Sequence, residues 1–445
     1  MNYPRVLVTI LGRINKADTA NNGLLLRNIF GNWPRENLAQ IFSGGDNGDQ
    51  GFLGRYYCLG SRDRRLGNLF YKLKSEALAE LVPMNIPESS PGRKISFVSF
   101  LRSWGKHLMM DSGLYELIFS PRISPEMLAW VEEFRPEIIF AQGYNLAFTW
   151  LPIMLAHHFH IPIAYYPGDD WSGHRYSSDL SGSTFVSQLA RRAVISSSRR
   201  LIETSAVRLA NSQYMREEYL KRYGQEFTVL MLGDDFKRTE AIPPLRLAEP
   251  SKCWIVCTGD FDRYRLPLLA DLNQACEILY GRGYNVHATV FPVNPISELS
   301  AYTNHYPYID FQPCPLHDGL MAVLRGADIL FLPERFDETS KFIQVSISTK
   351  AHLFMFSDKP IVVYSDPVTG IVRYAKEDGW AAAVDRRDPL LLANTFEKLI
   401  TDQDERQRLI DSARRTASKN HHLPTIQAKF YDLLCSALQE SKITD

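Results

Sequence analysis

The sequence lacks a surplus of charge of either sign. Its 445 residues include 50 Lys and Arg and 50 Asp and Glu, so the formal net charge is zero. A protein that binds nucleic acid generally needs an excess of positive charge to contact the phosphates. We therefore expect no nucleic-acid partner, although a local basic patch remains compatible with the balance.

Long hydrophobic runs and paired cysteines are also scarce. The N-terminal apolar stretch, residues 6–11, is too short for a secretory signal or a membrane span. The six cysteines form no C-x-x-C pair, and the closest two, Cys253 and Cys257, would point to one face of a strand as small buried hydrophobes. This pattern favours a soluble protein of the reducing cytoplasm and predicts no metal site.

Short apolar runs alternate instead with longer amphipathic segments, which implies crossover connections and mainly parallel sheets. The chain is long enough for two domains. In the first half we expect strands at 6–11, 38–42, 137–142, 161–166, 208–211 and 227–232, and helices at 23–31, 125–134, 146–159 and 213–223. In the second half we expect strands at 253–258, 285–291, 309–312, 328–332, 360–364 and 380–384, and helices at 267–281, 316–325, 346–356 and 368–376.

A proline-bearing stretch separates the two series. The prediction is an N-terminal domain over 1–236, a linker at 237–252, a C-terminal domain over 253–422 and a last helix over 423–445 that returns to the N-terminal domain. Ligands of open parallel sheets bind beyond the carboxyl ends of the strands, so two facing units would form a deep cleft.

The segment 346–384 contains the sharpest candidate site. A helix and a turn precede a buried strand that starts at Pro360, and the next helix should open at Thr369 and Gly370. Free N–H groups and the positive end of that helix would then suit a diphosphate. Lys350 would supply a positive charge beside it.

These residues resemble the donor-site signature of GT-B glycosyltransferases, in particular the family-4-like group, also called glycosyl transferases group 1. The matching positions are Ser348, Thr349, Lys350, Phe354, Lys359 and Pro360, and the upstream run 327–334, which ends in Glu334, is similar to the strand before the donor loop. The resemblance implies an α/β GT-B architecture of two Rossmann-like, doubly wound parallel-sheet domains. It also implies a nucleotide diphosphate sugar as co-substrate, with no cofactor and no metal.

The sequence departs from the family pattern at two positions. The glutamate that the family uses for the donor ribose is replaced by Leu353, which accepts no hydrogen bond, and a family histidine is replaced by Gly168. His352, Glu334 and Glu338 are alternatives for the ribose, and the departures also leave open a catalytically silent protein that assists another transferase.

A second donor element follows the first strand of the C-terminal half. Gly259 opens this loop, Arg265 falls where the family often has lysine, and Arg263 is nearby. Arginine suits phosphate because it donates two parallel hydrogen bonds. The alternative is an arginine that is merely at the surface or in a salt bridge.

On the acceptor side, polar and small residues follow three strands of the N-terminal half: Gly12, Asn22 and Gly23 after the first, Tyr144 and Asn145 after another, and Asp169, Asp170, Trp171 and His174 after a third. Asp169 or Asp170 would act as the catalytic base on an acceptor hydroxyl, or hold sugar hydroxyls. The alternative for the aspartates is a helix cap. The pair Asp234 and Asp235 is expected to be structural or to face the acceptor.

The predicted reaction is therefore sugar transfer from a nucleotide diphosphate sugar to a glycan, a lipid-linked or a small-molecule acceptor, with polysaccharide biosynthesis as the expected setting. The resemblance favours retention of configuration. Two basic clusters, at 55–74 and 191–200, are compatible with peripheral contact at the inner membrane face, and ordinary solvated faces are the simpler interpretation. A sugar-nucleotide epimerase is a weaker alternative because no additional acid/base set is found.

Overall fold

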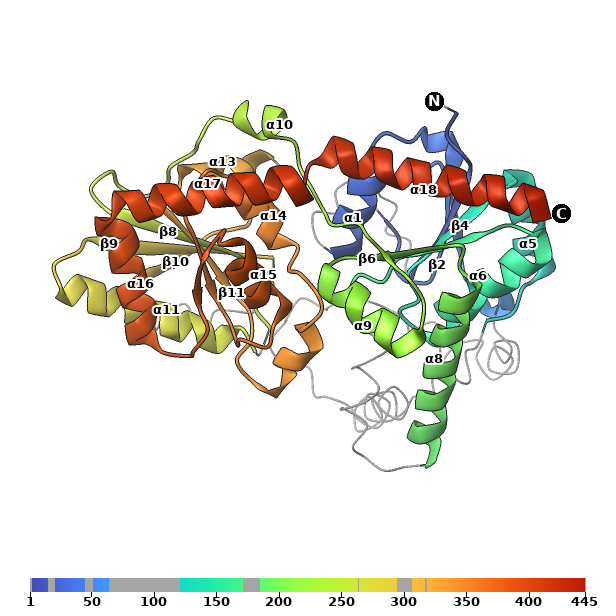
Figure 1. Cartoon of the computed structure of the whole chain (residues 1–445), viewed down its shortest axis with the longest axis horizontal. Helices are drawn as coiled ribbons and strands as arrows, with labels where there is room; N and C mark the ends of the chain where they lie inside the picture. The colour runs from blue at the N-terminus through green and yellow to red at the C-terminus, as the bar shows by residue number, and fades with distance from the viewer. Residues whose placement is uncertain are drawn as a thin grey trace, which may run out of the picture.

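The structure is a computed structural model in which two α/β halves lie side by side along the long axis (Figure 1). It describes residues 2–14, 21–44, 51–63, 121–170, 185–262, 264–293, 306–316 and 318–444. Each half is built on one sheet whose paired strands are all parallel. This arrangement confirms the predicted α/β architecture of two doubly wound domains.

Among the described residues, the N-terminal sheet has seven strands in the order β3-β2-β1-β4-β5-β6-β7. The order in which the strands are added to the sheet reverses between β1 and β4, which pair in parallel at its centre. The strands are β1 (Val6–Thr9), β2 (Leu38–Phe42), β3 (Arg55–Cys58), β4 (Ile138–Ala141), β5 (Ile163–Tyr165), β6 (Val207–Ala210) and β7 (Thr228–Val229). Its helices are α1 (Asn21–Phe30), α5 (Pro125–Phe134), α6 (Leu146–Phe159), α8 (Phe185–Thr204) and α9 (Gln213–Tyr223), with short 3₁₀ turns η1 (Arg35–Asn37) and η2 (Ser61–Asp63).

In the part of the C-terminal half that the structure describes, the sheet has six strands in the order β10-β9-β8-β11-β12-β13, so the strand order reverses between β8 and β11. The strands are β8 (Cys253–Gly259), β9 (Val286–Pro292), β10 (Ile309–Phe311), β11 (Ile329–Pro333), β12 (Ile361–Tyr364) and β13 (Ala382–Val384). The helices are α11 (Leu266–Gly281), α13 (Asp318–Gly326), α14 (Lys350–Met355), α15 (Gly370–Asp378), α16 (Pro389–Thr401) and α17 (Gln403–Asn420), with the 3₁₀ helix η5 (Glu338–Ile343).

Strand β8 shows why this sheet needs helices on both faces. Trp254 and Val256 pack into one hydrophobic cluster, while Ile255 and Cys257 pack into another on the opposite face. Side chains alternate along a strand, so a run that is apolar at every position must be covered on both sides. Cys253 and Cys257 contribute to the same cluster, as the sequence predicts.

Local capping fixes the helices whose limits the sequence predicts best. Ser124 caps α5 by accepting a hydrogen bond from the Met127 N–H, and Asn145 caps α6 in the same way through Phe148. Both helices begin and end at the predicted residues. The strand β3 and the long helix α8 were not predicted, and α14 is shorter than the expected helix.

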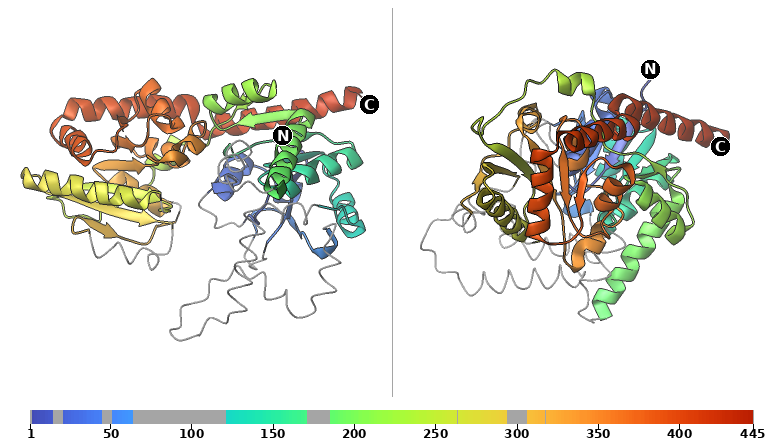
Figure 2. Two further views of the ribbon diagram at one scale, coloured as in Figure 1. Left: turned by 90° about the horizontal axis from the view of Figure 1, so that it is seen from below. Right: turned by 60° about the vertical axis from the view of Figure 1, so that its left-hand side comes forward.

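The chain crosses between the halves at two adjacent places. The Asp234 N–H donates to the His421 carbonyl at 2.9 Å, and the Leu423 N–H donates to the Asp234 carbonyl at 3.0 Å. From there α18 (Leu423–Thr444) runs over the N-terminal half, while α17 lies over the C-terminal half (Figures 1 and 2). The Phe430 ring packs edge-on against Phe30 with centroids 5.1 Å apart.

The stretch 237–252, predicted as a linker, is fastened to the C-terminal half. Its first residues belong to the short helix α10 (Phe236–Glu240), and the Leu245 N–H donates to the Ala322 carbonyl at 2.7 Å. Arg246 also forms an ion pair with Asp328 at 2.8 Å. The passage between the halves therefore lies at residues 233–235, earlier than the prolines suggested.

Candidate functional site

A cleft of about 770 Å³ opens between the two halves. Helix α1 and the crossing residues line it from the N-terminal half, and the carboxyl end of β8 with α13 and α14 lines it from the C-terminal half. Parallel α/β sheets bind ligands at this edge, next to the reversal of strand order. The polar side chains and glycines of the lining are Arg27, Asn28, Gly233, Asp234, Arg238, Thr258, Gly259, Asp260, Arg265, Asp318, Ser348, Thr349, Lys350 and His352.

A buried carboxylate and two cations form the centre of this site. Glu334 follows β11, and its side chain is 2% exposed. Its Oε2 accepts hydrogen bonds from Arg265 Nε at 3.0 Å and Nη2 at 2.5 Å, while Lys350 Nζ lies 3.2 Å from Oε1. Arg265 and Lys350 line the cleft, and Glu334 lies behind them. The glutamate therefore holds both cations in place.

The two cations decide the charge of Glu334. Burial alone would raise its pKa, but Arg265 and Lys350 outweigh burial and lower the pKa to about 2. The carboxyl group is ionised throughout the physiological range. Within this cluster two cations share one anion, an arrangement that suits a phosphate, and Asp260 lines the cleft beside them.

Gly259 provides the room that Lys350 needs. Its φ is +143°, and a Cβ built there would lie 3.0 Å from Lys350 Nζ and 3.2 Å from Lys350 Cδ. Only glycine adopts that backbone readily without pressing on the lysine. The sequence prediction that placed Gly259, Arg265 and Lys350 together agrees with this geometry, and Ser348 and Thr349 also line the cleft.

The remaining lining is apolar and concentrated on the C-terminal half. It includes Leu353, the residue in the position of the family glutamate, together with Leu24, Val293, Cys314, Pro315, Leu320, Met321, Leu324 and Leu423. His352 lies beside it, stacked on His421 with ring centroids 6.3 Å apart. Burial lowers the pKa of His352 to about 3, so its imidazole is neutral. The cleft thus has a cationic wall and an apolar wall.

Sequence reasoning did not assign a role to the ion pairs at the rim of the cleft. Arg238 pairs with Asp234 and with Asp318, each at 2.5 Å. Asp235 caps α10 through the Lys237 N–H. The charge-rich sequence around residue 235 is the available signal, but nothing in it indicates that Asp318 is the distant partner.

Three predicted donor residues do not line the cleft: Glu334, which lies behind Arg265 and Lys350, and Thr369 and Gly370. Thr369 is fully buried, and its hydroxyl donates to the Asp366 carbonyl at 2.7 Å. A Cβ on Gly370 would lie 2.7 Å from the Ser346 carbonyl oxygen and 3.1 Å from that of Gln344. The start of α15 thus packs against the backbone of residues 344–346 and does not line the cleft, and a diphosphate at its N–H groups stays a prediction.

Asp170, predicted as a possible catalytic base in the N-terminal half, is held in an ion pair instead. Its side chain is 0% exposed and forms a two-pronged ion pair with Arg222, at 2.7 and 2.8 Å. The Tyr219 hydroxyl donates to the same carboxylate at 3.0 Å. A carboxylate held in this way is a structural anchor and is not available as a base. Asp169, its neighbour, is exposed.

The other acceptor-side residues have local roles or lie outside the description. The Tyr144 hydroxyl accepts a hydrogen bond from the Gly168 N–H at 2.9 Å, and Asn145 is the cap of α6. The Gly12 carbonyl accepts from Gln40, while Asn22 and Gly23 lie in the first turn of α1. The predicted residues outside the described ranges are Arg263, Trp171 and His174.

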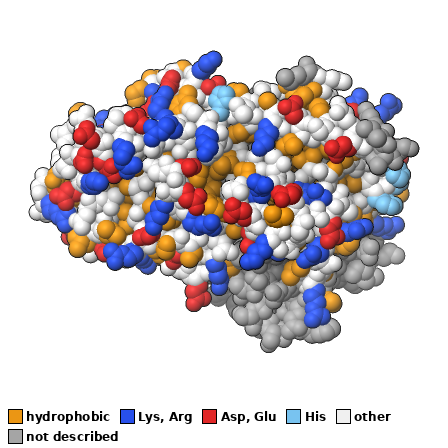
Figure 3. Space-filling model, viewed as in Figure 1, with side chains coloured by type: hydrophobic (Ala, Val, Ile, Leu, Met, Phe, Trp, Pro, Cys, Tyr) orange, Lys and Arg blue, Asp and Glu red, His pale blue; other side chains and the backbone are white. Residues whose placement is uncertain are grey.

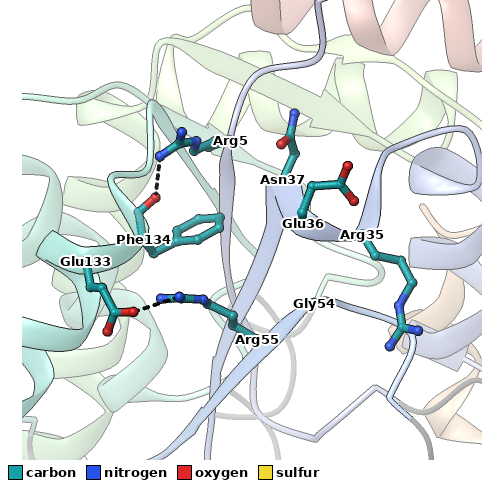
Figure 4. A pocket seen from close by; sticks show the side chains of 8 residues that line it. All are labelled: Arg5, Arg35, Glu36, Asn37, Gly54, Arg55, Glu133 and Phe134. Atoms are coloured by element: carbon teal, nitrogen blue, oxygen red, sulfur yellow. Dashed lines mark hydrogen bonds and ion pairs between the residues drawn. The ribbon is translucent and has the colours of Figure 1, made fainter.

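A second cavity, of about 610 Å³, lies at the opposite edge of the N-terminal sheet. Figure 4 shows Arg5 and Arg55 turned toward the end of α5, with Arg35 apart on the other side. Arg5 donates to the Phe134 carbonyl at 3.1 Å, Arg55 pairs with Glu133 at 2.7 Å, and Arg35 donates to the Gly51 carbonyl at 2.8 Å. These arginines serve the fold and do not converge on a common point.

The surface adds no large patch of one sign on the face shown in Figure 3, where blue and red side chains are interspersed. Arg192, Arg199 and Arg200 are exposed on α8, while most of the other basic cluster lies outside the described residues. Among the helices described, none is both long and apolar enough to cross a membrane.

Two doubly wound halves that face each other across a phosphate-suited cleft define the GT-B fold, and comparison with solved structures agrees. The computed structure matches Anabaena HepE in complex with UDP-glucose with a TM-score of 0.60, at 13% identity over 98% of this chain and 100% of that chain. It matches sucrose-phosphate synthase from Thermosynechococcus elongatus with a TM-score of 0.61, at 12% identity over 98% and 99% of the chains.

A third match is α,α-trehalose 6-phosphate synthase from Burkholderia multivorans, with a TM-score of 0.60 and 12% identity over 100% of this chain and 98% of that chain. No protein-family model matches the sequence, and no curated protein matches it. The likeness is therefore one of fold: the chain has the GT-B architecture that its donor-site residues resemble.

Proposed function

We propose that the protein is a glycosyltransferase that moves a sugar from a nucleotide diphosphate sugar to an acceptor hydroxyl. The observation that carries this proposal is the pair of cations, Arg265 and Lys350, held by buried Glu334 at the strand reversal of a GT-B cleft. The structural matches include HepE in complex with UDP-glucose and the synthases of sucrose phosphate and trehalose 6-phosphate, which supports the same class of donor.

In this reaction the cations act on the leaving group. As the bond between the sugar and the diphosphate breaks, negative charge builds on the phosphate oxygens. The side chains of Lys350 and Arg265 are only 13% and 17% exposed and are held by Glu334, so they need little reorganisation to stabilise that charge. The apolar wall beside Leu353 would cover the nucleoside. Closure of the cleft would exclude water and limit hydrolysis of the donor.

The acceptor side of the proposal rests on the N-terminal half. Asp169 is the remaining predicted carboxylate after β5, since Asp170 is held by Arg222. We assign Asp169 the role of orienting or deprotonating the acceptor hydroxyl. Retention of configuration, a glycan, lipid-linked or small-molecule acceptor, and a role in polysaccharide biosynthesis at the cytoplasmic side of a membrane belong to the same proposal, which invokes no cofactor or metal.

A catalytically silent GT-B protein that assists another transferase is the second candidate. Leu353 favours it because this side chain lines the cleft at the position where the family has its ribose-binding glutamate. An apolar side chain cannot replace the hydrogen bonds of a carboxylate. The two candidates share donor binding and differ in turnover.

A thermal-shift screen with UDP, GDP, ADP, TDP and CMP sugars tests the donor site. A ligand that binds only the folded state adds about 2.7 kcal/mol of stability at a concentration of 100 times Kd. We expect one nucleotide family to raise Tm, and Lys350→Ala and Arg265→Ala to abolish the shift. Lys376→Ala is the matched control, because Lys376 pairs with Asp385 away from the cleft.

Turnover separates the two candidates. Incubation of the shifting nucleotide sugar with candidate acceptors should release the nucleoside diphosphate in the wild type. Binding without release, with every acceptor class and with water, would favour the silent partner. The absence of a shift from every nucleotide sugar would contradict donor binding itself.

A further inference from the structure

Two ion pairs fasten the loop after β8 to the residues that follow β11. The first joins Arg265 to Glu334, as described above. The second joins Asp262 Oδ2 to Arg335 Nη2 at 3.0 Å. The Asp262 and Arg335 side chains are 30% and 17% exposed, and neither belongs to the lining of the cleft. The second pair is thus close to the donor site without facing it.

Asp262 also shapes the backbone of Arg265 directly. Its Oδ1 accepts hydrogen bonds from the Tyr264 N–H and the Arg265 N–H, both at 3.1 Å. The Asp262 carbonyl accepts from the Arg265 and Leu266 N–H groups, each at 3.0 Å. One side chain therefore orders the turn from which Arg265 projects and links that turn to Arg335.

Arg335 is in turn fixed to the sheet. Its N–H donates to Ser365 Oγ at 3.2 Å, and its carbonyl accepts from the Asp366 N–H at 2.8 Å, so its backbone is tied to the end of β12. The guanidinium lies 4.7 Å from the Tyr264 ring centroid and donates to Thr339 Oγ1 at 3.0 Å. Asp262 is thus anchored to a rigid element.

We propose that Asp262 and Arg335 are positioning residues for Arg265 at the phosphate wall of the cleft. Arginine has a flexible side chain, and the order imposed on its backbone and its head before binding lowers the loss of freedom on binding. The inference rests on the proposed function because it assumes that Arg265 meets the phosphates. It adds that binding of the nucleotide sugar depends on the Asp262–Arg335 ion pair, which does not line the cleft.

A double-mutant cycle with UDP and GDP as probes tests the coupling. In isothermal titrations we expect Arg265→Ala to weaken binding about tenfold or more, because charge-assisted bonds are lost. Asp262→Asn keeps the side-chain shape but removes the charge and replaces one acceptor oxygen with an NH2 group, and we expect it to weaken binding roughly fivefold. If Asp262 acts through Arg265, the double variant binds as weakly as Arg265→Ala alone.

A matched control distinguishes positioning from general loss of stability. Asp385 is 33% exposed and pairs with Lys376 at 2.6 Å, so Asp385→Asn removes a similar ion pair elsewhere in the same half. It should leave both Kd values unchanged. With a turnover assay, Asp262→Asn should lower kcat/KM for the donor, and Asp385→Asn should leave it unchanged. Additive losses in the double variant, or an unchanged Kd in Asp262→Asn, would overturn the inference.

Hydrogen exchange in the protein without ligand separates this inference from the proposed function. Arg335→Gln leaves every acceptor of the Tyr264 and Arg265 amides in place and removes the ion pair with Asp262, together with the guanidinium contacts to the Tyr264 ring and Thr339. We expect these two amides to exchange several-fold faster, with amides of β9 unchanged. Wild-type protein that binds no nucleotide of the thermal-shift screen would refute the proposed function, while unchanged exchange in Arg335→Gln would refute the positioning pair.

Discussion

The two halves of the molecule each bury a carboxylate just beyond a strand, yet they use it differently. In the N-terminal half, Asp170 follows β5 and is paired with Arg222 of α9. In the C-terminal half, Glu334 follows β11 and is paired with Arg265 and Lys350. Arg222 packs beside the rings of Tyr219 and Tyr223, at 5.5 and 5.8 Å from their centroids, whereas Arg265 and Lys350 face the cleft.

The difference teaches that a buried carboxylate is not by itself a sign of a reactive site. Both acids are paired with cations, because an unpaired charge in the interior would be strongly destabilising. The halves differ in the surroundings of the cation: Arg265 and Lys350 line the cleft, and Arg222 does not. A cation that lines the cleft can bind an anion, and a cation that lies beside aromatic rings away from the cleft stabilises the fold.

The largest effect that would sharpen this comparison is expected from Arg222→Ala. Removal of one partner of a buried ion pair leaves the other charge uncompensated, so the free energy of unfolding should fall by about 3–5 kcal/mol. Chemical denaturation measures this change. Nucleotide binding by the folded fraction should be retained, and its loss would show that the N-terminal pair belongs to the donor site after all.

A comparable effect should appear in the pH dependence of Glu334. Its pKa falls from an ordinary value of 4.5 to about 2 in the folded chain, so its stabilisation is complete above pH 4.5 and is lost as the pH falls toward 2. The shift corresponds to about 3 kcal/mol. Unfolding of wild type and Glu334→Gln between pH 5 and pH 2 should differ in slope, and parallel curves would contradict the assigned ionisation.

Gly259→Ala should have a smaller effect on stability and a specific effect on binding. The backbone at φ +143° is strained for alanine, by about 1–3 kcal/mol, and the added methyl would press on Lys350 Nζ at 3.0 Å. We expect a lower Tm together with weaker nucleotide binding. Gly224→Ala, at φ +69° with nothing near its Cβ, controls for backbone strain away from the cleft and should leave binding intact.

The smallest effect is expected at the opposite edge of the N-terminal sheet. Arg55→Ala removes an ion pair whose side chains are 42% and 67% exposed, so the change in unfolding free energy should stay within about 0.5 kcal/mol. Nucleotide affinity should also be unchanged. A marked loss of affinity would mean that the cavity lined by Arg5, Arg35 and Arg55 takes part in function.

The secondary structure could be predicted where local signals agree. Ser124 and Asn145 provide caps at the starts of α5 and α6, and Gly224 ends α9 in the left-handed conformation at φ +69°. The strand β3 was missed because its residues, Arg55 to Cys58, are polar or only half-buried at the edge of the sheet. Hydrophobic periodicity carries little information for such an edge strand.

The candidate site was predictable in part. Lys350 and Arg265 were identified from their motif, and the fold places them together at the carboxyl ends of adjacent strands. Asp170 shows the limit of this reasoning. An aspartate after a strand can serve as a catalytic base or as a structural anchor, and only the ion pair with Arg222 of α9 decides between the two roles. Asp262 and Arg335 carry no sequence signal, because each has meaning only through its distant partner.

The sequence by itself determined the alternation of strands and helices and the residue types at the strand ends, since both depend on interactions among neighbours in the chain. The tertiary structure decided which charges meet, which of them face the cleft, and where the chain passes between the halves. Those outcomes depend on residues as far apart as Asp262 and Arg335 or Asp234 and His421, whose approach follows from packing of whole elements. Charge pairing at a distance is therefore a property of the fold.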